Sequence, residues 1–139
     1  MISKKTIYGL QAAILLAKQF EGGPVLITDL AKEGRIPKKF LEAILLELRK
    51  NGILNSKKGK GGGYVLAKNP QDISVGDIIR NLQGSFSEID ALTGTKETDE
   101  ITLVMKDLGG AVSNILDKTS LADIIERAGS GKNVFNYMI

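Results

Sequence analysis

Apolar residues recur every three or four positions through most of this chain, and that spacing is typical of amphipathic helices. The first such stretch predicts a helix over residues 3–20, with Ser3 as its N-cap. Gly22-Gly23-Pro24 then predicts a turn. The chain therefore opens on a helix that has one face to bury against the later helices.

Two more helices, separated by a tight break, come next. Thr28 is expected to cap the first of them. The second begins at Pro37, turns Phe40 and several leucines inward, and stops at Asn51-Gly52. A short helix, a break and a longer amphipathic helix follow one another in the order of a helix-turn-helix.

Two short strands are predicted directly afterwards, at residues 53–56 and 64–67. The segment KKGKGGG joins them at 57–63. Its three adjacent glycines permit positive φ angles, so they favour a tight and mobile hairpin tip. A lysine-rich hairpin behind a helix-turn-helix predicts a wing.

The rest of the chain predicts further helices. Ser74 is expected to cap a helix over 75–82, and residues 85–99 are interpreted as a loop because their apolar periodicity is weak. Ser120 is expected to cap a last short helix. That helix should stop at Gly129, where a flexible Gly-Ser-Gly joint begins the C-terminal tail.

A long helix over 100–118 carries two apolar stripes. One stripe has the a/d spacing of a coiled coil and consists of Ile101, Val104, Leu108, Ala111 and Ile115. The other consists of Met105, Val112 and Leu116. Two apolar faces need two surfaces to cover them, so we expect one to pack on the first domain and one on a second copy. The alternative is a monomer that buries the helix by itself.

The predicted fold class is mainly α with a small β-hairpin wing. A winged helix-turn-helix domain occupies residues 1–84, with its helix-turn-helix at 28–51 and its wing at 53–67. After the loop, dimerisation helices are expected at 100–128 and the tail at 129–139.

Charge divides the chain into two unlike halves. The net charge is +3, but residues 1–70 contribute +8 and residues 71–139 contribute −5. Because the basic half coincides with the predicted helix-turn-helix and wing, we interpret it as a surface for duplex DNA. One alternative is that the basic half is only a solvated face with no ligand. The alternative function is a module that binds an acidic protein.

The chain contains neither cysteine nor histidine. Disulfides, thiolate-bound zinc and Cys-ligated clusters are thereby excluded, and the commonest general base is missing. No carboxylates stand at catalytic spacing, so we expect no enzyme, no catalytic residue, no metal and no cofactor. No apolar run approaches the roughly 20 residues of a membrane span, and no secretory signal is visible, so a cytoplasmic protein is expected.

The start of the predicted recognition helix supplies the first candidate DNA contacts. Such a helix reads the major groove with its N-terminal residues. Lys38 and Lys39 can bind phosphate or guanine, and Glu42 can accept from cytosine. The alternative for Glu42 is an intrahelical or solvated carboxylate.

The wing and the preceding helix supply the other candidate contacts. Lys57, Lys58 and Lys60 crowd a glycine-rich tip, and cations favour the narrow minor groove of A-tracts. Thr28 heads the first helix of the pair, where free N–H groups can hold a phosphate. The loop lacks the Ser or Thr after GK that a nucleotide-binding P-loop needs.

Four segments resemble the Rrf-two (Rrf2) family of winged-helix regulators. They are SKKTIYGLQA at 3–12, FLEAILLELRKNGIL at 40–54, GKGGGYVLA at 59–67 and ISVGDIIRNLQG at 73–84. The resemblance implies a homodimer joined through the long helix, with two recognition helices on a near-palindromic site. By position, Lys39, Phe40 and Glu42 match the base-reading segment, and Lys58 matches the wing residue that enters the minor groove.

The chain departs from the family at the loop 85–99, where cluster-binding members carry three cysteines and this chain has none. It therefore resembles the cluster-free branch, typified by a repressor of cysteine metabolism. The segment DKTSLADI and the aromatic terminus that ends in Ile139 carry that likeness.

The same resemblance implies a protein partner. The repressor of that branch binds cysteine synthase, whose active site accepts C-terminal isoleucine carboxylates. Tyr137, Met138 and Ile139 are therefore a candidate docking tail. The alternative is that Phe135 and Tyr137 pack against the dimer.

Overall fold

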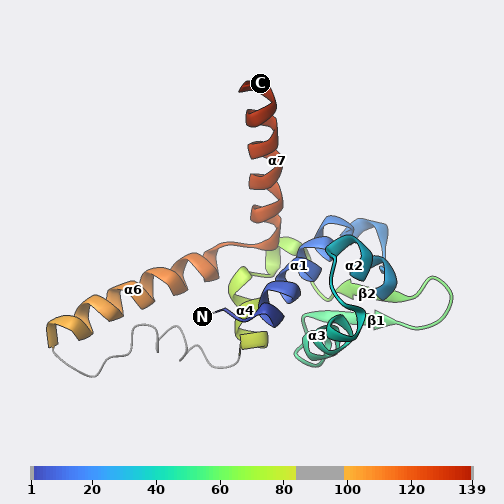
Figure 1. Ribbon diagram of the computed structural model, residues 1–139, viewed down its shortest axis with the longest axis horizontal. Coiled ribbons are helices and arrows are strands. Elements are labelled where there is room, and N and C mark those ends of the chain that lie inside the picture. The colour runs from blue at the N-terminus through green and yellow to red at the C-terminus, as the bar shows by residue number, and fades with distance from the viewer. Residues whose placement is uncertain (1, 84–98, 139) are drawn as a thin grey trace.

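The computed structural model describes residues 2–83 and 99–138, with side chains described for 2–83 and 100–130. In chain order its elements are α1 (Lys4–Lys18), the 3₁₀ turn η1 (Phe20–Gly22), α2 (Ile27–Gly34), α3 (Lys38–Lys50), β1 (Leu54–Lys57), β2 (Gly63–Leu66), the 3₁₀ turn η2 (Pro70–Asp72), α4 (Val75–Gln83), α6 (Asp99–Lys118) and α7 (Leu121–Met138). The two strands form an antiparallel hairpin, so the predicted fold class is confirmed. Figure 1 shows α1 to α4 and the hairpin gathered in one body, from which α6 and α7 extend in different directions.

One apolar core joins the helices of this body to the wing strands. The leucine-rich face of α3 lies at its centre, and Leu41, Ile44, Leu45 and Leu48 are fully buried, as predicted. Helix α1 contributes mainly small residues to the same core. At Gly9 even a Cβ atom would overlap the Leu82 side chain, so glycine lets α1 and α4 approach closely.

The prediction that Phe40 points into the core is wrong. Its side chain is 48% exposed, because the buried face of α3 is already formed by other residues and Phe40 falls on its flank. The Phe40 ring instead meets Tyr8 of α1 edge-on, with ring centroids 5.8 Å apart.

The helix-turn-helix begins slightly earlier than its sequence suggested. Helix α2 starts at Ile27 with Leu26 as its N-cap, and no side chain caps it, so the prediction that Thr28 is the cap is wrong. The chain leaves α2 through Arg35, whose left-handed φ of 52° makes the tight break before α3. Pro37 occupies the N-cap of α3, and Gly52, with a φ of 79°, follows its end.

The wing strands are displaced by one residue from their predicted positions. Leu54 pairs with Leu66 at one end of the hairpin, and Lys57 pairs with Gly63 at the other. Lys57 therefore belongs to β1, and only residues 58–62 form the tip.

A short antiparallel bridge joins the start of α4 to the start of α7. The Val75 N–H donates to Thr119 O over 2.8 Å, and the Leu121 N–H donates to Ile73 O over 2.9 Å. These bonds flank the paired residues Ser74 and Ser120. The junction ties α6, which precedes this bridge, to the body.

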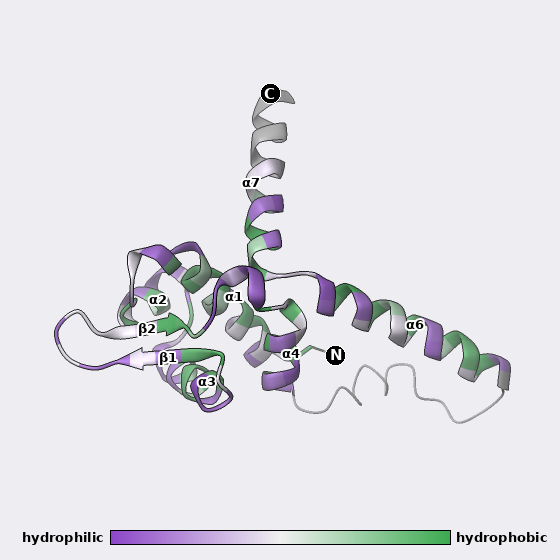
Figure 2. Ribbon diagram, turned by 180° about the vertical axis from the view of Figure 1, so that it is seen from behind, coloured by the Kyte–Doolittle hydropathy of each residue, from purple (hydrophilic) through white to green (hydrophobic). Residues whose placement is uncertain are grey.

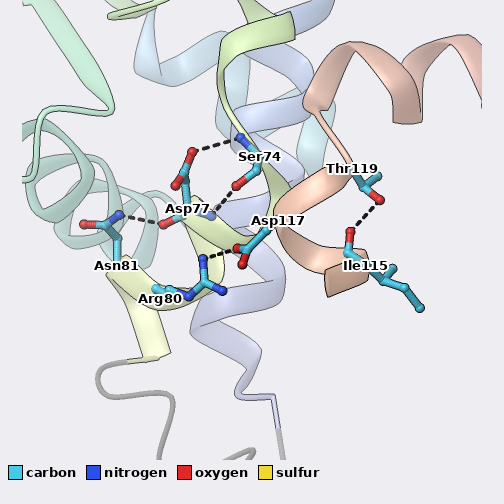
Figure 3. A network of polar contacts seen from close by, with 7 residues as sticks. All are labelled: Ser74, Asp77, Arg80, Asn81, Ile115, Asp117 and Thr119. Carbon is cyan, nitrogen blue, oxygen red and sulfur yellow. Dashed lines mark hydrogen bonds and ion pairs between the residues drawn. The ribbon is translucent and has the colours of Figure 1, made fainter. Parts of the chain in front are cut away.

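Both serines of this bridge cap the helix that each precedes, as predicted. The Ser74 hydroxyl accepts from the Asp77 N–H while the Asp77 carboxylate accepts from the Ser74 N–H. Ser120 and Asp123 repeat the arrangement. Figure 3 shows the first of these reciprocal pairs beside the ion pair that joins Arg80 of α4 to Asp117 of α6. The start of α4 and the end of α6 are thus held by backbone, caps and charge together.

The two apolar stripes of α6 have different surroundings, as the sequence predicted. All five residues of the a/d stripe are exposed; Val104, Leu108 and Ile115 are 58%, 51% and 62% exposed. Met105, Val112 and Leu116 are half-buried, and α6 packs on α4. Figure 2 shows hydrophobic residues recurring along the projecting α6. A second copy as the cover of the open stripe stays a prediction.

Helix α7 is longer than predicted. It continues to Met138, so the expected stop at Gly129 and the flexible joint after it are wrong. Leu121 is fully buried and Ile125 packs on the core, so the first turns of α7 are anchored in the body.

The predicted loop up to residue 98, Ile139, and the side chains of Tyr137 and Met138 lie outside the described residues. Among the helices that are described, none is long and apolar enough to cross a membrane.

Candidate nucleic-acid interface

The first two turns of α3 carry four exposed side chains that the sequence had singled out. Lys38, Lys39, Phe40 and Glu42 all face solvent, while Leu41, the one residue between them, is held in the core. Within the described part of the chain, neither lysine is paired with a carboxylate, and Glu42 has no basic partner. The leading end of α3 therefore presents two cations, an aromatic ring and one acceptor group to the outside.

The wing tip carries the remaining cations on a tight turn. Gly59 and Gly61 have φ angles of 90° and 78°, which side chains with a Cβ rarely adopt. The Gly62 N–H closes the turn by donating to Gly59 O over 2.9 Å. Lys58 and Lys60 are exposed on this tip, and Lys57 is exposed at the end of β1.

Two backbone hydrogen bonds fix the wing against the start of the helix-turn-helix. Val25 and Tyr64 each donate an N–H to the other's carbonyl, both over 2.8 Å. Gly63 makes this approach possible: its φ is 143°, and a Cβ there would overlap the carbonyl of Val25. Sequence reasoning used the three glycines only for the hairpin tip and missed this role. The sequence feature that could have indicated this role is the position of Gly63 directly before Tyr64, at the start of the returning strand.

A second contact joins the wing to the recognition helix itself. The Arg49 guanidinium, near the end of α3, donates to the Ser56 hydroxyl of β1 over 3.0 Å. The strands of the wing are therefore held both to the start of the helix-turn-helix and to the end of α3.

Thr28 lies in the first turn of α2, next to the acidic Asp29. Its backbone N–H is among those that a helix leaves without an intrahelical partner. A phosphate contact at Thr28 stays a prediction.

Two helices in tandem with a hairpin docked beside them define a winged helix-turn-helix. The chain belongs to the Rrf2 family, whose model, described as an iron-dependent transcriptional regulator, matches residues 2–127.

Named relatives agree with this assignment. The chain is 33% identical over 139 residues to the HTH-type transcriptional regulator CymR of Bacillus subtilis, and the match covers 99% of each protein. The solved structure of B. subtilis CymR, called the global cysteine regulator, has a TM-score of 0.78 at 32% identity, over 91% of this chain and 97% of that one. IscR of T. potens also has a TM-score of 0.78, at 34% identity, over 92% and 88%. The chain is therefore a transcriptional regulator of the helix-turn-helix type and not an enzyme.

The family's description raises the question of iron. With no cysteine and no histidine, this chain has no thiolate or imidazole to offer a metal. Among the residues that the structure describes, no three acidic side chains gather as a metal-binding group. The residues present do not fit a Cys-ligated iron–sulfur cluster.

Replacement of Gly63 tests the docking of the wing. In Gly63→Ala the new Cβ meets the Val25 carbonyl and the φ angle becomes strained, so we expect a loss of about 1–3 kcal/mol in the free energy of unfolding, measured by urea denaturation. DNA affinity should fall as well, because the tip lysines lose their position. Gly61→Ala is the matched control: its φ of 78° is also positive, but a Cβ there meets open space. Equal effects of the two variants on DNA affinity would contradict a positioning role for Gly63.

Proposed function

We propose that this chain is a homodimeric, sequence-specific DNA-binding repressor that acts in the cytoplasm without an iron–sulfur cluster of its own. The observation that carries the proposal is the set of exposed lysines at the start of α3 and on the wing. The Val25–Tyr64 bridge and the Arg49–Ser56 contact hold the wing strands to the helix-turn-helix that carries the other lysines. Family membership supports the same reading.

In this proposal, α3 and the wing contact different parts of the duplex. The leading end of α3 enters the major groove, where Lys39 pairs with guanine or phosphate and Glu42 accepts from cytosine. Lys58 reaches the minor groove, and Lys38, Lys57 and Lys60 bind phosphates. A protein held on the duplex in this way represses by occupying sites that the transcription machinery needs.

Selection of bound duplexes from a genomic library tests this proposal. We expect one enriched, near-palindromic motif, and an observed affinity that falls steeply with salt. Lys39→Ala or Glu42→Ala should change the base preference by about 1–3 kcal/mol at the position each residue reads. Lys58→Ala should weaken binding broadly or at A/T-rich minor-groove positions.

Lys106→Ala, which removes the same charge from α6, is the control for Lys58→Ala and should leave the affinity near that of the wild type. Absence of any enriched motif, together with a salt slope near zero, would overturn the proposal. It would favour a module that binds an acidic protein instead.

The dimer is proposed from the open stripe of α6. Five apolar side chains in a/d spacing remain exposed on a helix that projects from the body, and a second copy of α6 can cover them. A two-fold dimer of this kind presents two recognition helices to a near-palindromic site.

Charge placed within the stripe should separate the two protomers. Leu108→Glu buries a carboxylate in the proposed interface, so we expect the sedimentation coefficient to fall to that of a monomer at micromolar protein. Lys106→Glu changes charge outside the a/d stripe of the same helix and should leave the dimer intact. A wild-type protein that sediments as a monomer would contradict the dimer.

The metabolic role and the protein partner are proposed from the likeness to the cysteine regulator. We propose a role in cysteine or sulfur metabolism, and we propose that the tail Tyr137-Met138-Ile139 docks into cysteine synthase. The likeness to the solved CymR, called the global cysteine regulator of B. subtilis, supports the metabolic role.

Deletion of Ile139 tests the tail. If the terminal carboxylate enters the active site of cysteine synthase, the variant should lose affinity by at least about tenfold in a calorimetric titration, which corresponds to about 1.4 kcal/mol. Lys106→Ala, on α6, serves as the control that should bind like the wild type. Equal binding by the deletion variant, or no binding by either form, would refute the docking tail.

A further inference from the structure

The first two turns of α1 pack along α3, and Tyr8 in the second turn meets the leading end of α3. The Lys4 ammonium sits over the Tyr8 ring, 5.9 Å from its centroid, and the Tyr8 ring contacts the exposed Phe40 ring edge-on. A cation from one helix is thereby connected through two aromatic rings to the segment of α3 that we propose to read the major groove.

Two adjacent lysines in this turn have different electrostatic surroundings. Lys5 is already paired with Glu47 of α3, its Nζ lying 2.6 Å from the carboxylate oxygen. Lys4 is exposed, and in the part of the chain that the structure describes it has no carboxylate partner. No acidic residue stands in the first turn of α1 to offset its charge. Lys5 therefore holds α1 to α3, while the charge of Lys4 remains available to a ligand.

The backbone that carries Lys4 is firmly placed. The Ser3 N–H and the Thr6 hydroxyl both donate to Gln83 Oε1 at the end of α4, over 3.1 and 2.7 Å. The Ser3 hydroxyl caps the helix by accepting from the Thr6 N–H, and Thr6 is completely buried. Lys4 thus projects from a fixed turn and needs little ordering of the backbone to meet a partner.

We propose that Lys4, supported by the Tyr8 ring, binds a backbone phosphate of duplex DNA at the edge of the major groove that α3 enters. This inference rests on the proposed DNA-binding function and adds α1 to the interface. The major groove is about 12 Å wide and a helix with its side chains about 10–12 Å across. A cation beside the leading end of α3 therefore faces the phosphates that line the groove. Such a contact positions the protein and carries no base preference.

Salt titrations of DNA binding test the contact. Affinity is measured by fluorescence anisotropy on the duplex enriched from the genomic library and on an unrelated duplex of equal length. Each phosphate contact contributes about 0.9 to the slope of log K against log salt, so Lys4→Ala should flatten the slope by about 1.8 for a dimer with two such contacts. The loss should appear on both duplexes, because a phosphate contact is independent of sequence. Lys4→Arg should retain the slope.

Lys18→Ala is the matched control, since it removes an identical charge from the exposed far end of the same helix and should keep the wild-type slope. A Lys4→Ala protein with the wild-type slope would overturn this inference and leave the proposed function intact. Equal flattening by Lys4→Ala and Lys18→Ala would also overturn it, because net charge alone would then explain the effect. A wild-type protein whose binding ignores salt would overturn the proposed function and this inference together.

Discussion

The pair of backbone hydrogen bonds between Val25 and Tyr64 is the constraint on which the candidate interface depends. A two-stranded hairpin is only marginally stable by itself. Here it is held to a residue just before α2, and Gly63 is the position that permits the approach. The wing strands also share the apolar core through Leu54 and Leu66, and Arg49 adds a contact to β1. The Val25–Tyr64 bonds add the tie to the start of the helix-turn-helix, so the wing that carries the candidate lysines is held at more than one place.

A second constraint links this interface to the projecting helices. The Ser74–Ser120 bridge starts α4 and α7 at one point, and Arg80 ties α4 to Asp117 at the end of α6. The Ser120 N–H, the Ser120 hydroxyl and the nearby Arg127 lower the pKa of Asp123. A carboxyl with a lowered folded-state pKa stabilises the fold above its unfolded pKa, and that contribution is lost as the pH falls through the folded value. The Ser74–Ser120 bridge therefore fixes the starts of α4 and α7 relative to each other.

The sequence alone predicted the helices in which the apolar face and the capping residues indicate the same boundaries. Ser3, Ser74 and Ser120 cap their helices as predicted, and the leucine face of α3 is buried as predicted. The wrong predictions occur where contacts between distant parts of the chain determine the local structure. Periodicity could not show that Tyr8 offers Phe40 a partner outside the core, nor that the backbone stays helical beyond Gly129. The role of Gly63 depends on Val25, which lies far earlier in the chain, and no local pattern reveals such a contact.

The charge at the helix starts differs between the candidate interface and the other described helices for which first-turn charges are given. Helices α2, α4 and α7 each carry an aspartate in the first turn, where an acid complements the positive end of the helix. Helices α1 and α3 carry no acid in the first turn and each begins with two adjacent lysines. A cation at the positive end of a helix costs about 0.3–1 kcal/mol of stability for each exposed charge. The Tyr8–Phe40 contact joins the second turn of α1 to the first turn of α3. Lys5 has a partner in Glu47, whereas Lys4, Lys38 and Lys39 have no carboxylate partner among the described residues. Cationic charge that is unfavourable at a helix start in the free protein becomes favourable where a polyanion binds, so these three lysines are the ones that the proposed DNA complex would stabilise.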